Sequence, residues 1–320
     1  MKRVLVTGAA GFIGFHLCKT LLQKGFHVIG IDNFNHYYDP KLKEDRVKFL
    51  DMQILRSDIC DREALIKLLK EEKITHIAHL AAQAGVRHSL THPDDYVASN
   101  LNGFVSIMEA CRHFPNIKVV FASSSSVYGS NEKIPFQEND KTEQPTNLYG
   151  ATKKANELIA YSYHHLFNIP IIGLRYFTVY GPWGRPDMAY YSFTRCILEK
   201  RSIPIFNNGL MQRDFTYIDD IILGTVSALD YPDKFEIFNL GNNQPIDLMH
   251  FISILEKLLG KRAIIDMKPN QKTEVPITFA DITKSQKLLN YHPSTKLEEG
   301  LMKFLEWFHE YHKVPSYLTF

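Results

Sequence analysis

The stretch that decides the fold is residues 3–14, which read RVLVTGAAGFIG. A short apolar strand pattern runs directly into Gly8, Gly11 and Gly14, and a helical pattern continues over residues 12–23. The first glycine permits a tight strand-to-helix turn, the second lets backbone approach a pyrophosphate, and the third lets the helix pack closely on the sheet. We therefore expect a dinucleotide site here, the alternative being a tight turn that binds nothing.

Two acidic residues further along support a dinucleotide. Asp32 ends the next strand pattern, residues 27–32, where a carboxylate accepts hydrogen bonds from the adenosine ribose. The same charge repels a 2′-phosphate, so the sequence favours NAD over NADP. Asp58 follows the next strand-like run and is placed to meet the adenine, with a role as helix N-cap as the alternative.

Composition limits the class of protein. The chain has 320 residues, of which 45% are hydrophobic and 22% charged, and this excludes a disordered or collagen-like chain. The formal net charge of +2 gives no general attraction to nucleic acid or anionic lipid. No apolar run approaches the ~20 residues that span a membrane. The four cysteines form no CxxC pair, which predicts reduced thiols in the cytoplasm.

Short apolar runs alternate with helical patterns through the first half of the chain, and this predicts a doubly wound parallel sheet of the Rossmann type. The expected strands are 3–7, 27–32, 74–80, 118–123 and 170–175, with a further strand within 48–55. The expected helices are 12–23, 62–72, 96–111 and 151–165.

The pattern changes after Tyr180. Residues 181–189, GPWGRPDMA, predict a loop. Later segments predict strands at 203–206 and 236–240, a helix from Ile218, and helices at 248–259 and 297–311. We divide the chain into a dinucleotide-binding domain, residues 1–176 plus about 218–243, and a smaller C-terminal lobe, about 177–217 plus 244–320.

Tyr149 and Lys153 form a Y-x-x-x-K pair whose i, i+4 spacing places both side chains on one helical face. A lysine ammonium beside a phenol favours the phenolate and lowers the tyrosine pKa, as a general base requires. The spacing alone is common in solvated helices. The serine run 123–126 at the end of a strand supports a catalytic role for this pair, because ligands bind at strand ends on this side of such a sheet.

Together these residues resemble the extended short-chain dehydrogenase/reductases, within them the nucleotide-sugar epimerases, and most closely the UDP-glucuronate 4-epimerases. The broad resemblance rests on the glycine pattern, Asp32, the serine run, the Y-x-x-x-K pair and LRYF at 174–177. The narrower one rests on DNFNHYYD at 32–39, AAQAGVR at 81–87 and YFTVYGPWGRPDMA at 176–189.

The resemblance implies an enzyme in which Tyr149 removes the proton of the sugar 4-hydroxyl while the C4 hydride passes to NAD. A 4-keto sugar then rotates in the pocket and takes the hydride back on its other face. Lys153 supports Tyr149 and the nicotinamide ribose, and either Ser124 or Ser126 holds the sugar oxygen. The implied cofactor contacts are Gly8, Gly11, Phe12, Ile13, Gly14, Asp32, Asn33, Asp58, Ile59, Leu80, Ala81, Ala82, Tyr149, Lys153 and Tyr176.

The resemblance also implies substrate contacts. Thr178 stands where UDP-galactose 4-epimerases carry asparagine, and Ser125 belongs to the serine run. Arg185 suits a C6 carboxylate because a guanidinium donates two parallel hydrogen bonds, the alternative being a loop arginine on the surface. Arg87 and Arg213 are candidates for the UDP phosphates. The lobe is thus expected to bind a nucleotide sugar, and a homodimer is expected through helices 96–111 and 151–165.

Other functions stay open. We expect no metal, because the histidines lack a ligand spacing typical of zinc. UDP-glucose or UDP-N-acetylglucosamine 4-epimerisation, UDP-glucuronate decarboxylation and a non-catalytic NAD-binding scaffold are the alternatives. One segment departs from the family: residues 273–281 read TEVPITFAD, where relatives often have Gly-Asp-Val before the proline.

Overall fold

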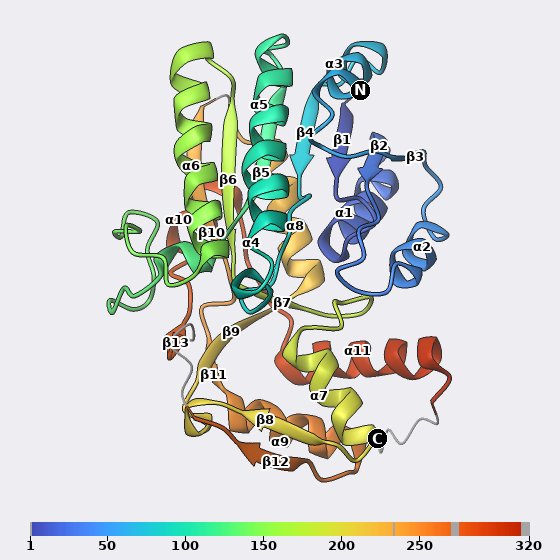
Figure 1. Cartoon of the computed structure of the whole chain (residues 1–320), viewed down its shortest axis with the longest axis vertical. Helices are drawn as coiled ribbons and strands as arrows, with labels where there is room; N and C mark the ends of the chain where they lie inside the picture. The colour runs from blue at the N-terminus through green and yellow to red at the C-terminus, as the bar shows by residue number, and fades with distance from the viewer. Residues whose placement is uncertain (1, 233, 270–274, 315–320) are drawn as a thin grey trace.

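The computed structural model describes residues 2–232, 234–269 and 275–314. Its main body is a seven-stranded parallel sheet in the order β10-β6-β5-β4-β1-β2-β3 (Figure 1). The chain winds outward from β1 in both directions, which creates a crevice at the carboxyl ends of β1 and β4. The strands are β1 Arg3–Thr7, β2 His27–Asp32, β3 Ile54–Arg56, β4 His76–His79, β5 Lys118–Ser124, β6 Ile171–Tyr176 and β10 Phe235–Leu240.

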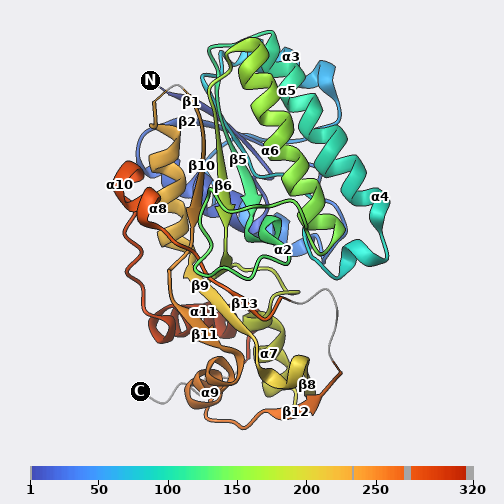
Figure 2. The same ribbon diagram turned by 90° about the vertical axis from the view of Figure 1, so that its left-hand side faces the viewer.

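Helices cover both faces of this sheet, as the alternating pattern predicts (Figure 2). In β1, Val4 and Val6 join one apolar core while Leu5 joins the other, because successive side chains of a strand point to opposite faces. The first core is covered by α1 Phe12–Gln23, α8 Ile218–Leu229 and α10 Thr283–Leu289, and the second by α3 Arg62–Glu71, α5 Phe104–Arg112 and α6 Leu148–Phe167.

Three of the predicted elements differ from the structure. The strand expected within 48–55 is wrong over most of its length: α2 Lys41–Val47 comes first, and β3 pairs with β2 only from Ile54. The helix expected over 96–111 is a composite of α4 Pro93–Tyr96, the π-helical η2 Val97–Gly103 and α5. The helix expected from residue 151 begins at Leu148, which places Tyr149 in its first turn.

The remaining segments form a second, smaller body below the sheet (Figure 1). The strand β9 Gln212–Tyr217 pairs with β7 Thr178–Tyr180, β11 Pro245–Asp247 and β13 Ile277–Thr278, while β8 Ser202–Ile205 pairs with β12 Ile264–Met267. The helices here are α7 Ala189–Leu198, α9 Leu248–Leu259 and α11 Leu297–His312. Our division into two domains stays a prediction. Among the described residues, no helix is long and apolar enough to cross a bilayer.

Candidate active site

A cavity of about 890 Å³ lies where the carboxyl ends of the large sheet meet the smaller body. Its wall takes residues from strands and loops that are far apart in the sequence. Every residue that the sequence assigned to a site lines this cavity except Asp58: Gly8, Gly11, Phe12, Ile13, Gly14, Asp32, Asn33, Ile59, Leu80, Ala81, Ala82, Arg87, Ser124, Ser125, Ser126, Tyr149, Lys153, Tyr176, Thr178, Arg185 and Arg213.

The glycine-rich turn forms one end of the cavity and fits a pyrophosphate. Helix α1 begins after Gly11, with no side-chain cap and no acidic residue in its first turn. Its first N–H groups therefore lack an intrahelical partner, and an anion can accept from them. A Cβ atom on Gly14 would lie 2.0 Å from the Gly8 carbonyl oxygen, so this closeness of helix to turn depends on glycine.

We expect Gly14→Ala to separate α1 from the turn, destabilise the protein by about 1–3 kcal/mol and abolish co-purification of the dinucleotide. Urea unfolding and the ratio of absorbance at 260 and 280 nm would measure the two effects. Gly25→Ala is the control, because Gly25 has a φ of +77° but open space around its Cβ position. That variant should cost about 1–2 kcal/mol and keep the dinucleotide. Equal dinucleotide retention in both variants would contradict the assignment.

Asp32 lies beside the turn, and each of its carboxylate oxygens accepts a hydrogen bond from a backbone N–H. One accepts from Ala10 N at 3.1 Å and the other from Phe34 N at 2.8 Å. Each oxygen keeps a further lone pair for a ribose hydroxyl. Asp58 does not line the cavity itself but contacts a residue that does: its carboxylate accepts a hydrogen bond from Asn33 Nδ2 at 2.8 Å. Its alternative role as a helix cap is wrong, since Asp61 caps α3.

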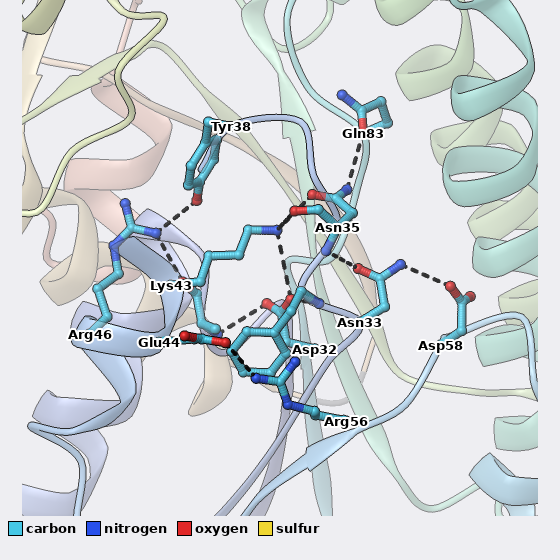
Figure 3. A network of polar contacts seen from close by, with 12 residues as sticks. Asp32, Asn33, Asn35, Tyr38, Lys43, Glu44, Arg46, Arg56, Asp58 and Gln83 are labelled. Carbon is cyan, nitrogen blue, oxygen red and sulfur yellow. Dashed lines mark hydrogen bonds and ion pairs between the residues drawn. The ribbon is translucent and has the colours of Figure 1, made fainter. Parts of the chain in front are cut away.

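Sequence reasoning did not assign a role to Lys43, on α2. The side chain is buried, and its Nζ donates to the Asn35 side-chain oxygen at 2.6 Å and lies 3.9 Å from Asp32 (Figure 3). Burial lowers the pKa of Lys43, while the Asp32 charge acts in the opposite direction. Asn35, Tyr37 and Gln83 also line the cavity, and all three lie within the family-like stretches 32–39 and 81–87.

Tyr149 faces the cavity from the first turn of α6. The Asn147 side chain caps this helix by accepting from Gly150 N at 2.8 Å, and so fixes where the turn begins. Burial raises the pKa of Tyr149, whereas a hydrogen bond with Ser124 and the charge of Arg185 act to lower it. Of the two serines left open by the sequence, Ser124 is therefore the one with this contact to Tyr149.

Lys153 lies one turn along the same helix, and both side chains line the cavity. Its Nζ donates to the Ala122 carbonyl at 2.8 Å, and its effect on the pKa of Tyr149 stays a prediction. The side chain is 3% exposed, and this burial lowers the pKa of Lys153 itself from 10.5 to about 8. Keeping the Lys153 ammonium protonated in this buried position therefore costs free energy of folding.

That cost predicts a pH effect on stability. Between pH 8 and 10.5 the unfolded chain keeps a proton on Lys153 that the folded chain has released, so the penalty is complete below pH 8 and fades as the pH rises. Lys153→Met removes it. We consider the difference in free energy of unfolding, variant minus wild type, in dinucleotide-free protein. We expect this difference to fall by about 2–3 kcal/mol between pH 7 and pH 10.5. A pH-independent difference in urea unfolding would contradict this.

Arg185 extends from the loop before α7 and is held by Asp187. Its Nε and Nη2 donate to the two carboxylate oxygens at 3.0 and 2.7 Å, and Tyr37 OH donates to the second oxygen at 3.1 Å. Arg185 lines the same cavity as Tyr149, and its side chain is 23% exposed, so it does not lie on an open outer surface. Its surface alternative is thereby excluded.

Arg87 and Arg213 also line the cavity. The Arg87 guanidinium lies 4.5 Å from the centre of the Phe206 ring, and Arg213 donates to the Pro276 carbonyl at 3.1 Å. Asp214, next in β9, accepts from Asn242 N at 2.7 Å and fixes this strand in place. Two guanidinium groups in one cavity suit a diphosphate.

Within the departing segment, Thr273 and Glu274 lie outside the described residues, while Val275 and Thr278 line the cavity. Among the residues that the structure describes, no three histidine, cysteine or acidic side chains are grouped as a metal site requires.

Comparisons with known proteins agree with this geometry. Residues 4–241 match the NAD dependent epimerase/dehydratase family. The chain is 49% identical to UDP-glucuronate 4-epimerase 4 of Arabidopsis thaliana, over 97% of this chain and 76% of that protein. It superposes with a TM-score of 0.91 and 39% identity on the crystal structure of UDP-glucuronic acid 4-epimerase from Bacillus cereus in complex with UDP-glucuronic acid and NAD, covering 97% and 99% of the two chains.

The structure of UDP-glucose 4-epimerase from Thermotoga maritima with UDP-glucose is also similar, with a TM-score of 0.88 and 28% identity over 97% of this chain and 99% of that one. The fold is thus shared across these enzymes, while the sequence is nearer to the two that carry UDP-glucuronate in their names. The glycine-rich turn, the parallel sheet and these matches agree: the chain belongs to the NAD dependent epimerase/dehydratase family.

Proposed function

We propose that this protein catalyses the NAD-dependent 4-epimerisation of UDP-glucuronate to UDP-galacturonate. The observation that carries the proposal is the placement of Tyr149, Ser124 and Arg185 together in one cavity that begins at the glycine-rich turn. The first two provide for proton transfer at a sugar hydroxyl, and the third provides for a carboxylate. The similarity to UDP-glucuronate 4-epimerases supports the same substrate.

The cofactor end is served by the turn, Asp32 and Lys153. We propose that the α1 N-terminus binds the pyrophosphate, Asp32 the adenosine ribose and Lys153 the nicotinamide ribose. Bound there, NAD would supply reversible hydride acceptance at the sugar C4, with no net redox change. The folded protein keeps Lys153 positively charged at pH 7 in spite of the free-energy cost of burial. Once a ribose hydroxyl connects Lys153 with Tyr149, this charge favours the phenolate of Tyr149.

Tyr149 acts as general base at the 4-hydroxyl and as general acid on the return step. Its phenolate is favoured by the Ser124 hydroxyl, which also reaches the sugar oxygen, and by the Arg185 charge. We assign Ser125 and Ser126 to the remaining sugar hydroxyls and Thr178 to the far side of the ring. Arg87 and Arg213 then hold the diphosphate.

The Nη1 side of the Arg185 guanidinium is available to bind the substrate. Its Nε and Nη2 bind Asp187, whereas Nη1 has no hydrogen-bond partner among the described residues. A C6 carboxylate can accept from this edge in the plane of the guanidinium. Holding it matters because a 4-keto uronate is a β-keto acid, which loses carbon dioxide when its carboxylate rotates out of the carbonyl plane.

Parallel incubations with UDP-glucuronate, UDP-glucose and UDP-N-acetylglucosamine, followed by anion-exchange chromatography, would test the proposal. We expect UDP-galacturonate from the first and at most trace turnover of the two neutral sugars. A UDP-pentose would identify a decarboxylase, and turnover confined to neutral sugars would identify a different epimerase. Bound NAD without turnover of any sugar would indicate a scaffold.

We further propose that the protein forms a homodimer and is located in the cytoplasm. We also propose that its product serves as a sugar donor for polysaccharide biosynthesis. Leu158, Tyr161 and Leu166 of α6 are each more than half exposed, which supports pairing of this helix with its copy. The four cysteines are unpaired, as expected in a reducing compartment. Light scattering of wild type and Leu158→Glu would test the dimer.

A further inference from the structure

Arg46, on α2, is a fully buried arginine without an acidic partner. No carboxylate of the described residues lies within ion-pair distance of its guanidinium, which donates instead to Tyr38 OH at 2.7 Å (Figure 3). Burying an unpaired cation costs several kcal/mol unless hydrogen bonds replace its hydration. The acceptors of Arg46 must therefore be well placed, and they show what the residue holds together.

These acceptors join two parts of the cavity wall. Nη1 donates to the Ala10 carbonyl, within the glycine-rich turn, at 2.9 Å. Nε and Nη2 donate to the Trp183 carbonyl at 3.1 and 2.7 Å, and Nη2 also donates to the Gly184 carbonyl at 3.2 Å. Residues 182–187, which we call the arm, carry Arg185 directly after these two carbonyls. One guanidinium thus fastens the arm to the dinucleotide-binding turn.

The arm has a strained conformation that needs such support. Trp183 has a φ of +60°, in the left-handed region, where a bulky side chain costs about 1–2 kcal/mol. Its carbonyl is held by Arg46, and its ring packs 5.2 Å from the Trp307 ring between their centres. The preceding residue is held as well, since the Pro182 carbonyl lies 2.9 Å from His16 Nε2.

We propose that Arg46 is a positioning residue: by holding the Trp183 and Gly184 carbonyls against the turn, it sets the reach of Arg185 toward the sugar carboxylate. This rests on the proposed function, in which Arg185 binds that carboxylate. Ala10 is held on both sides, by Arg46 through its carbonyl and by Asp32 through its N–H. The cofactor end and the substrate end of the cavity therefore share one fixed peptide.

Arg46→Lys is the informative change, because lysine keeps the charge but cannot donate to three separated carbonyls at once. Arg46→Gln, which donates without a charge, provides a second variant if the first does not fold. Arg56→Lys is the matched control: Arg56 also binds a residue of α2, Glu44 at 2.9 Å, but is exposed and does not line the cavity.

The first measurement is the dissociation constant of UDP-glucuronate and of UDP-glucose in NAD-loaded protein carrying Tyr149→Phe, so that no turnover occurs. We expect Arg46→Lys to weaken UDP-glucuronate about tenfold and UDP-glucose less than about twofold. In protein that also carries Arg185→Ala, Arg46→Lys should have no further effect. Equal weakening of both ligands, no weakening, or a loss that persists without Arg185 would overturn the proposal.

The second measurement needs neither ligand. Trp307→Phe leaves Trp183 as the only tryptophan, since the chain has two. We expect Arg46→Lys to increase acrylamide quenching of Trp183, and Arg56→Lys to leave it unchanged. Unchanged quenching in Arg46→Lys would overturn the proposal. If quenching rises but the parent protein binds both sugars equally, the proposed function fails while the hold of Arg46 on the arm stands.

Discussion

Tyr149→Phe is expected to lower kcat for UDP-glucuronate by about 10²–10⁴-fold, while the protein still folds and retains NAD. The change removes one hydroxyl and leaves the ring in the cavity wall. Without it, Ser124 has no phenol to polarise, and the proton of the sugar 4-hydroxyl has no acceptor. Initial rates from the chromatographic assay would measure the loss, and absorbance at 260 nm would report the retained NAD.

Tyr163→Phe is the matched control, because Tyr163 lies on the same helix but donates to Glu109 at 2.5 Å, outside the cavity. Its rate should stay within about twofold of wild type, as for most changes away from the site. A Tyr149→Phe enzyme that keeps most of its rate would show that another group takes the proton.

Arg185→Ala is expected to reduce kcat/KM for UDP-glucuronate by about 100-fold or more, because it removes the charge partner of a desolvated carboxylate. Binding of UDP-glucose, which has no carboxylate, should change by less than about threefold. Arg185→Lys should fall between wild type and alanine, since an ammonium keeps the charge without the fork. Kinetics on UDP-glucuronate and calorimetry with UDP-glucose would give both values.

The contrasting result is an equal loss for both sugars. It would mean that Arg185 supports the cavity wall in general, for example through its ion pair with Asp187, rather than recognising the carboxylate. Asp187→Asn separates these roles, because it frees Arg185 without removing it. This variant should reduce the rate on UDP-glucuronate much less than Arg185→Ala does.

The sequence predicts the fold correctly where a local sequence pattern permits only one local structure. The strand 3–7, the glycine-rich turn and the helix 12–23 appear with the expected bounds, because a buried parallel strand and a glycine-dependent turn leave few alternatives. Tyr149 and the serine run both line the cavity: the serine run lies at the carboxyl end of β5, and Tyr149 lies in the first turn of α6, the next α-helix along the chain.

Other features depend on contacts that no local pattern contains. The stretch KLKEDRV at 41–47 consists mostly of charged residues, yet α2 buries Lys43 and Arg46 because their acceptors come from Asn35 and the arm. Likewise, the Y-x-x-x-K spacing does not reveal that Lys153 donates to the Ala122 carbonyl on β5.

The central claim is that hydride leaves and returns at C4 within one cavity, on NAD that the protein retains. Proton NMR of purified protein with UDP-glucuronate deuterated at C4, in ordinary water and without added cofactor, tests it most directly. The account predicts UDP-galacturonate that keeps its deuterium at C4. Product that carries hydrogen at C4, or no product even after NAD is added, would contradict it.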